Sequence, residues 1–369
     1  MDFLFSEPQK KLRDAIRTLA EESKLQRLDR VAVIAKTPFW PKLAEAGLWG
    51  FLTPSACGGR DCAPIEVAII FEEMARSAPL IALALAEHNM LSIRHLERFG
   101  DAHQREKWLA PAVQAPTLGS WCPADEDRES PRGASETRAE KKGGDWVLNG
   151  SKMTLANGGQ ADWTIVTATT KASIGKESLS SFILDKGTAG LRWEKAGESR
   201  VPEERGIAGL ILEDVRVPAE DLLGHEGAGA RDVLSLLDAC RGCLAALCLG
   251  LAANALETCV ALSRKRFAAL TSGQKAPKEM AILADRMTEL DRARLMTYRA
   301  AFVEARTSGP CAESEAACDY AVDLALKSVA LSDRFVPAKR RGRQGPSLQE
   351  RSSAIVRRWL MTRSVLEGV

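Results

Sequence analysis

Residues 215–229 read VRVPAEDLLGHEGAG, and residues 237–241 read LDACR. Upstream of this stretch lie short apolar runs separated by turn-forming residues, a pattern typical of β-strands. Downstream, from Gly229, apolar residues recur at the three- to four-residue spacing of a helix. The stretch therefore marks the passage from a β region, which we expect to end near Pro218, to a helical region.

The β region is defined by four runs of apolar or β-branched residues. Asp145–Gly150 should be a strand that ends in an Asn-Gly turn, because this dipeptide favours the tight turns of hairpins. We expect further short strands at Trp163–Thr169, Leu179–Leu184 and Gly209–Leu212.

Helical periodicity characterises the sequence on both sides of the β region. Helices are predicted over 65–75, 80–99, 231–267, 280–305 and 316–331. We therefore predict three domains: an N-terminal helical domain over 1–118, a middle β domain over 119–222 and a C-terminal helical domain over 223–369.

The composition excludes several classes of protein. The chain of 369 residues is 45% hydrophobic and 27% charged, which provides a large core and excludes wholesale disorder. Lys and Arg number 51 against 49 Asp and Glu, and this balance argues against nucleic-acid binding. The nine cysteines lack the spacing of a disulfide framework or a zinc site, and the opening residues lack a secretory signal. We expect reduced thiols, no metal and a cytoplasmic location.

The longest uncharged stretch is the 15-residue run 242–256. It is shorter than the roughly 18 residues expected of a membrane span, so we interpret it as a buried core helix and expect no membrane association. In an oligomer, the same apolar run is the best candidate for a face that another subunit covers.

Four segments together resemble the acyl-CoA dehydrogenase family. Besides 215–241, they are AEKKGGDWVLNGSK at 139–152, NGGQADW at 157–163 and the helical pattern of 283–301. They occur in the family's order and spacing, and the resemblance covers nearly the whole chain. It implies a mostly α fold with a central β domain: an N-terminal helical domain, a middle β barrel and a C-terminal four-helix bundle.

The resemblance also implies a chemistry. In this family FAD lies between the β domain and the bundle, with an acyl-CoA thioester against the flavin. A Glu carboxylate removes the α proton while a hydride leaves the β carbon for flavin N5. The expected partners are therefore an acyl-CoA thioester, an electron-accepting protein and further subunits in a homo- or hetero-oligomer.

The family's motifs assign roles to residues that contact the substrate. Glu367 is the expected catalytic base, because it follows Arg358 at the family's spacing of nine residues. Asp238 and Arg241 match positions near the pantetheine chain of CoA, and Ser130 matches a serine that contacts pantetheine. The same residues have ordinary interpretations as a solvated glutamate and as a charge pair at a helix terminus.

The flavin-contacting positions depart from the family's pattern. The positions that the resemblance assigns to FAD are Trp121, Cys122, Ala124, Thr154, Ala156, Arg264, Phe267, Gly342 and Gly345. Ala124 and Ala156 replace hydroxyl residues, and Thr154 replaces an aromatic residue that stacks on the flavin. Losing one neutral hydrogen bond costs about 1 kcal/mol, and losing a stacked ring costs about as much again. We therefore predict weak FAD binding by this chain alone.

Two interpretations of the function follow from these departures. In the first, the chain is a subunit of an FAD-dependent acyl-CoA dehydrogenase with Glu367 as its base. In the second, it is a non-catalytic, flavin-poor partner subunit of a hetero-oligomeric acyl-CoA dehydrogenase.

Overall fold

The computed structural model describes residues 4–25, 39–114, 117–123, 137–153, 157–170, 178–193, 209–267, 278–307 and 311–335. The chain divides into two compact units. The first, which we call the helical unit, comprises Met1–Val31, Ala63–Leu83 and Ala239–Val356. The second, which we call the sheet unit, comprises Ala32–Cys62, Ala84–Asp238 and Arg357–Val369.

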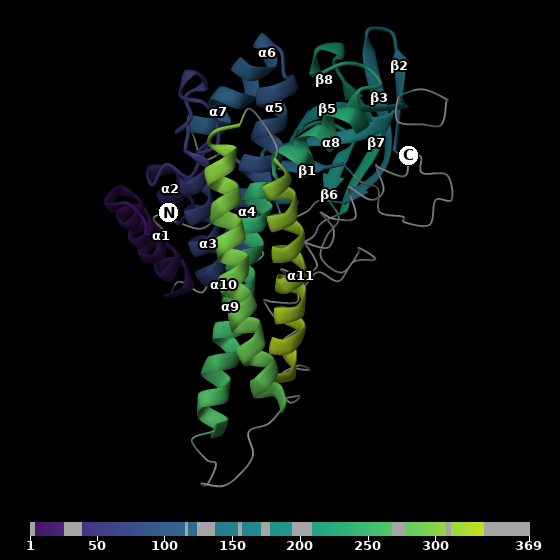
Figure 1. Ribbon diagram of the computed structural model, residues 1–369. Coiled ribbons are helices and arrows are strands. Elements are labelled where there is room, and N and C mark those ends of the chain that lie inside the picture. The colour runs from purple at the N-terminus through teal and green to yellow at the C-terminus, as the bar shows by residue number, and fades with distance from the viewer. Residues whose placement is uncertain are drawn as a thin grey trace. The chain divides into compact units, whose positions relative to one another are not determined.

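The helical unit is built on long helices that pack along their lengths. They are α1 (Glu7–Leu25), α3 (Pro64–Ser77), α9 (Arg241–Phe267), α10 (Lys278–Glu304) and α11 (Ala312–Phe335). Figure 1 shows α9, α10 and α11 side by side, and α9 also packs against α3. A side chain at Gly250 would place its Cβ only 2.4 Å from the Glu72 carbonyl, so glycine permits this close approach of α9 to α3.

Helix α9 contains the apolar run 242–256, and its burial resolves two expectations. Arg241–Arg264 is the one helix among the described residues long and apolar enough to cross a membrane, and 78% of its apolar window is buried inside the chain. The predicted core helix is therefore confirmed. The expectation that this run is a face for another subunit is wrong, because α3, α10 and α11 of the same chain already cover it.

The predicted helix over 231–267 is in fact two helices. Helix α8 (Gly229–Ala239) ends and α9 begins on either side of Cys240. The sequence shows continuous helical periodicity here because both helices bury apolar faces, so periodicity alone does not reveal the break.

The sheet unit begins with short helices. They are α2 (Phe39–Glu45), the end of α4 (Pro79–Ala86), the π-helix η4 (Glu87–Ile93), α5 (Arg94–Phe99), α6 (Ala102–Gln104), the π-helix η5 (Arg105–Leu109) and α7 (Ala110–Gln114). The predicted helix over 80–99 thus contains a π-helical turn. Such turns often occur at functional sites.

An eight-stranded sheet follows, and its predicted strands are present. The strands are β1 (Gly119–Cys122), β2 (Arg138–Lys142), β3 (Asp145–Met153), β4 (Trp163–Thr169), β5 (Leu179–Asp185), β6 (Leu191–Trp193), β7 (Gly209–Val217) and β8 (Leu222–Leu223). Their order is β6-β7-β3-β2-β4-β5-β8, with β1 paired to β4. Strands β1, β2, β6 and β8 were not predicted from the sequence pattern.

The core of the sheet forms where apolar side chains of neighbouring strands meet. Trp146 of β3 and Phe182 of β5 are both buried, and their ring centroids lie 5.5 Å apart in an edge-on arrangement. Each fully buried aromatic side chain contributes a large apolar area, and edge-on pairs add about 0.5–1.5 kcal/mol. This core holds the strands that lead to the candidate site.

The predicted turn at Asn149–Gly150 is wrong, because β3 continues through both residues. The pairing of β3 with β7 shifts register between Leu148 and Gly150, which is a β-bulge. The Asn149 side chain donates to Asp214 Oδ1 at 3.1 Å and accepts from the Asp214 N–H at 2.8 Å. These bonds hold the asparagine against β7 within the sheet, and the hairpin turn lies earlier, between β2 and β3.

Candidate functional site

Strand β1 is an edge strand that leads directly to the residues assigned to the flavin. It pairs in parallel with β4 from Gly119 opposite Trp163 to Cys122 opposite Val166. Its other edge would leave backbone N–H and C=O groups without strand partners, and such groups are costly when they are buried.

Side chains take the place of a neighbouring strand along this edge. His88 Nδ1 accepts from the Gly119 N–H at 3.0 Å, and Glu87 Oε1 accepts from the Trp121 N–H at 2.8 Å. The Gly119 carbonyl accepts from Asn157 Nδ2 at 3.0 Å. Strand β1 is therefore secured on one side by β4 and on the other by buried polar side chains.

Glu87 also reaches a second segment of the chain. Its other oxygen, Oε2, accepts from the Asn157 N–H at 2.9 Å. Glu87 is 1% exposed and Asn157 is 2% exposed. A buried carboxylate is tolerated only where hydrogen bonds replace its hydration, and two main-chain N–H donors provide them here.

Two buried histidines that accept hydrogen bonds from strand β1 are neutral. His88 Nε2 lies 3.3 Å from the Ala112 carbonyl, so Nε2 carries the proton and Nδ1 is the acceptor. Burial lowers the pKa of His88 to about 4, against a raising effect of the bond to Ala112. His95 accepts at Nδ1 from the Trp121 indole N–H at 3.2 Å, and burial, with the nearby Arg98 charge, lowers its pKa to about 3. Both rings serve as fixed hydrogen-bonding groups at neutral pH.

A second chain of hydrogen bonds holds the end of β1. Lys152 of β3 is fully buried, and its Nζ donates to Thr167 Oγ1 at 3.2 Å. The Thr167 hydroxyl donates in turn to the Pro123 carbonyl at 2.7 Å. Pro123 directly precedes Ala124, so this relay anchors the backbone at the start of the segment assigned to the flavin.

Comparison with known proteins agrees with this architecture. Models of the acyl-CoA dehydrogenase N-terminal, middle and C-terminal domains match residues 6–115, 124–215 and 227–329. The mitochondrial isovaleryl-CoA dehydrogenase of Pongo abelii is 30% identical over 321 residues, which are 85% of this chain and 75% of that protein. The chain belongs to the acyl-CoA dehydrogenase family. The predicted family and fold class are thereby confirmed.

Two further acyl-CoA dehydrogenases show how far the likeness extends. The mitochondrial short-chain specific acyl-CoA dehydrogenase of Mus musculus is 30% identical over 263 residues, 71% of this chain and 64% of that protein. This chain therefore spans less than two thirds of that relative. The solved structure of butyryl-CoA dehydrogenase from Megasphaera elsdenii is 26% identical, covers 99% of both chains and superposes with a TM-score of 0.81.

Within this acyl-CoA dehydrogenase fold, Trp121 and Cys122 have their polar atoms engaged inside the sheet unit. The Trp121 side chain is fully buried with its indole N–H on His95. The Cys122 thiol lies 3.4 Å from the Thr164 hydroxyl, and burial raises its pKa to about 12, so it stays a thiol. Neither polar atom is presented to a ligand, and the assignment of these residues to FAD stays a prediction.

Asp238 and Arg241 stand on either side of the break between α8 and α9. Arg241 Nη1 lies 2.6 Å from Glu315 Oε1 of α11, and the Arg241 side chain is 12% exposed. The Glu304 carboxylate lies against Gly242, where a Cβ would be 2.6 Å from both of its oxygens. Negative charge at this position favours the N-terminus of α9. Arg241 thus has a carboxylate partner within the helical unit.

Most of the other predicted positions lie outside the described residues. These are Glu367, Ser130, Ala124, Thr154, Ala156, Gly342 and Gly345. Arg264 is exposed near the end of α9, where a guanidinium fits the chemistry of a pyrophosphate. Phe267 is the last residue of α9. The assignment of Arg264 and Phe267 to FAD stays a prediction, and the strand leading to the flavin segment is held on both sides.

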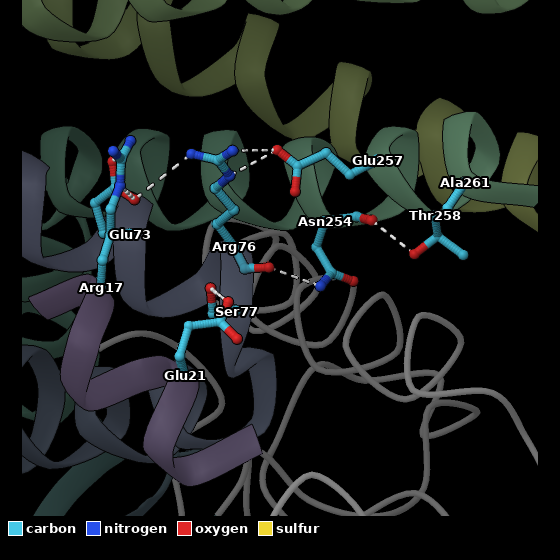
Figure 2. Close-up of a pocket in the computed structure, with 9 residues that line it drawn as sticks. All are labelled: Arg17, Glu21, Glu73, Arg76, Ser77, Asn254, Glu257, Thr258 and Ala261. Atoms are coloured by element: carbon cyan, nitrogen blue, oxygen red, sulfur yellow. Dashed lines mark hydrogen bonds and ion pairs between the residues drawn. The ribbon is translucent and has the colours of Figure 1, made fainter. Parts of the chain in front are cut away.

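A polar groove of about 500 Å³ lies elsewhere, in the helical unit. Figure 2 shows its lining residues: Arg17, Glu21, Glu73, Arg76, Ser77, Asn254, Glu257, Thr258 and Ala261. Arg17 donates twice to the Glu73 carboxylate at 2.6 and 2.8 Å, and Arg76 donates to Glu257 at 2.6 Å. The arginine charges are already matched by glutamates, so the groove ties α1, α3 and α9 together and includes no residue predicted for catalysis.

Sequence reasoning missed the residues that hold β1. Glu87, His88 and Asn89 form a polar triplet inside an otherwise apolar stretch, and all three are buried. A cluster of polar residues in a buried helix indicates specific hydrogen-bonding partners, and this clue was available in the sequence. The identity of the partners of Glu87 and His88 was not, because Gly119, Trp121 and Asn157 lie far from them in the sequence.

Proposed function

We propose that this chain is a subunit of an FAD-dependent acyl-CoA dehydrogenase that oxidises an acyl-CoA thioester between its α and β carbons. The observation that carries the proposal is the match of all three family domains in order along the chain. The firmly held strand β1, which leads to the predicted flavin segment, adds support from the structure.

The chain's own residues supply the proton transfer and the binding of the substrate. The Glu367 carboxylate accepts the α proton, which the thioester carbonyl makes weakly acidic. A carboxylate in a dry pocket is a stronger base than one in water, because burial raises its pKa. Asp238, Arg241 and Ser130 bind the CoA portion, and FAD, when bound, accepts the hydride from the β carbon.

FAD binding is proposed to be weak in the isolated chain. Ala124, Thr154 and Ala156 lack the side chains that other members of the family place against the flavin. Arg264, Phe267, Gly342 and Gly345 are proposed to meet the pyrophosphate side. We further propose that the protein works in the cytoplasm as a homo- or hetero-oligomer and passes electrons to an acceptor protein.

The second candidate is a non-catalytic, flavin-poor partner subunit of a hetero-oligomeric acyl-CoA dehydrogenase. It is favoured by the missing flavin-facing side chains and by the internal engagement of Trp121 and Cys122. In this case a partner chain supplies both the flavin and the base.

An absorption spectrum of the purified full-length chain, with and without added FAD, tests the two candidates. A catalytic subunit takes up FAD and loses the visible flavin absorption when a matching acyl-CoA is added without oxygen. A protein that is colourless once excess FAD has been removed contradicts the catalytic proposal and supports the partner-subunit alternative.

A further inference from the structure

We propose that Glu87 is a positioning residue that holds together the two chain segments flanking the predicted flavin site. The inference rests on the proposed function, because its ligand is FAD. It assigns to a buried carboxylate on η4 a role in flavin affinity, in addition to its contribution to folding.

The geometry places Glu87 at the junction of two segments. Trp121, bonded to Oε1, lies three residues before Ala124. Asn157, bonded to Oε2, directly follows Thr154–Ala156. One carboxylate therefore holds the backbone shortly before the first of these segments and directly after the second. Support of this kind keeps a binding site in its productive shape.

The chemistry of the side chain matters as much as its position. Both contacts are N–H groups that need an acceptor, and a carboxylate offers two acceptor oxygens. Glutamine of the same shape has one acceptor and one NH₂ group, so one backbone N–H would face another donor. Aspartate keeps the charge but is one carbon shorter, and it reaches both N–H groups only if a segment moves.

Further hydrogen bonds hold the residues around Glu87 in place. Asn157 Nδ2 donates to the carbonyls of Ala84 and Gly119, each at 3.0 Å, so the residue is held by side chain and backbone together. His88 secures Gly119 beside it. With these bonds in place, Glu87 is the one group among the described residues that joins the Trp121 backbone directly to the Asn157 backbone.

The test compares FAD affinity in the full-length wild type, Glu87→Gln and a matched control, Glu72→Gln. Glu72 is also a buried carboxylate, but its partners are Arg294 and Tyr298 of the helical unit. We measure the FAD dissociation constant from the quenching of flavin fluorescence, and the unfolding temperature without FAD. Glu87→Gln is expected to weaken FAD binding about 10–100-fold, the effect of losing one hydrogen bond to a charged group. Glu72→Gln is expected to lower the unfolding temperature and leave the dissociation constant within about twofold.

Each outcome decides the proposal. If Glu87→Gln binds FAD as the wild type does, Glu87 has only a structural role, and the proposed function stands without this inference. If the wild type takes up no FAD, the proposed function fails, and the inference fails with it. If Glu87→Gln does not fold, Glu87→Asp replaces it. Its FAD affinity is expected to be lower than that of the wild type, by less than the loss expected for Glu87→Gln. Unchanged affinity in Glu87→Asp then overturns the inference.

Discussion

Two buried carboxylates, Glu72 in the helical unit and Glu87 in the sheet unit, are held in different ways. In the helical unit, Glu72 of α3 accepts from Arg294 Nε and from the Tyr298 hydroxyl of α10, both at 2.8 Å. In the sheet unit, Glu87 accepts from two backbone N–H groups, those of Trp121 and Asn157. The first carboxylate has side-chain partners and the second has main-chain partners.

The difference indicates what each carboxylate controls. Side-chain partners such as Arg294 are long and can adjust, so Glu72 fastens one helix to another and contributes mainly to stability. Burial and the neighbouring Glu72 raise the pKa of Tyr298, which keeps its hydroxyl proton for this bond. Backbone partners cannot adjust without moving the chain, so Glu87 fixes the backbone positions of Trp121 and Asn157. Glu72 therefore contributes mainly to stability, whereas Glu87 contributes to stability and, by our proposal, to the geometry of the predicted flavin site.

The largest effect is expected for Glu367, the predicted catalytic base. Glu367→Gln preserves shape and removes basicity, so turnover with an acyl-CoA should fall by about 10²–10⁴-fold, the contribution of a positioned general base. FAD content and unfolding temperature should match the wild type, since glutamine has the shape of glutamate and only the basicity is lost. Steady-state kinetics, in the presence of any partner chain, measure this. Unchanged turnover would show that another carboxylate is the base.

Lowering the pH should destabilise the sheet unit before it destabilises the helical unit. All four histidines, His88, His95, His103 and His225, belong to the sheet unit. The pKa values of His88 and His95 are lowered from 6.5 to about 4 and about 3, so the folded state resists their protonation. Their contribution to stability is complete above pH 6.5 and is lost as the pH falls toward 4. The loss is on the order of 3 kcal/mol for each ring.

Hydrogen–deuterium exchange at pH 7 and pH 5, corrected for intrinsic rates, measures this prediction for each unit separately. Peptides from η4 and β1 should lose protection at pH 5, while peptides from α9 should not. Equal loss of protection in both units would contradict a histidine origin. In His88→Gln the change should be smaller, because the neutral amide also donates and accepts but does not titrate.

Removing the carboxylate from the helical unit should reduce stability. Glu72→Ala leaves Arg294 and the Tyr298 hydroxyl without their shared acceptor, and we expect the free energy of unfolding to fall by about 2–3 kcal/mol. This lies below the usual cost of breaking a buried ion pair because the Arg294 side chain is 36% exposed. Urea denaturation measures it. The control is Glu257→Ala, which removes an exposed partner of Arg76 and should cost less than about 1 kcal/mol.

The smallest effects are expected for two glycine-to-alanine changes, one in each unit. An added Cβ at Gly250 would lie 2.4 Å from the Glu72 carbonyl, and one at Gly119 would lie 2.5 Å from the Trp163 ring. Each glycine-to-alanine change should reduce the free energy of unfolding by about 1–2 kcal/mol through overpacking. Only Gly119→Ala should also weaken FAD binding, because it displaces β1. Equal FAD affinity in the two variants would count against the role assigned to that strand.

Much of the fold could be predicted from the sequence, because it depends on local periodicity. Trp163–Thr169 is a short run of apolar and β-branched residues typical of a strand, and it forms β4 with these bounds. The predicted helix over 280–305 corresponds to α10, Lys278–Glu304. The break at Cys240 and the bulge at Asn149 could not be predicted in this way. The break interrupts a stretch that has helical periodicity on both sides. The bulge depends on hydrogen bonds between Asn149 and Asp214, which are far apart in the sequence.

The family, the order of its elements and the candidate residues for catalysis were determined by the sequence itself, because motifs such as 215–241 retain their order and spacing along the chain. The tertiary structure decided what the sequence left open: that the apolar run of α9 is covered by its own chain, and that Arg241 pairs with Glu315. It also decided that Glu87 links Trp121 to Asn157. The physical reason is that hydrophobic periodicity is a local property, whereas a buried polar atom is satisfied only by the particular partner that folding brings within hydrogen-bonding distance.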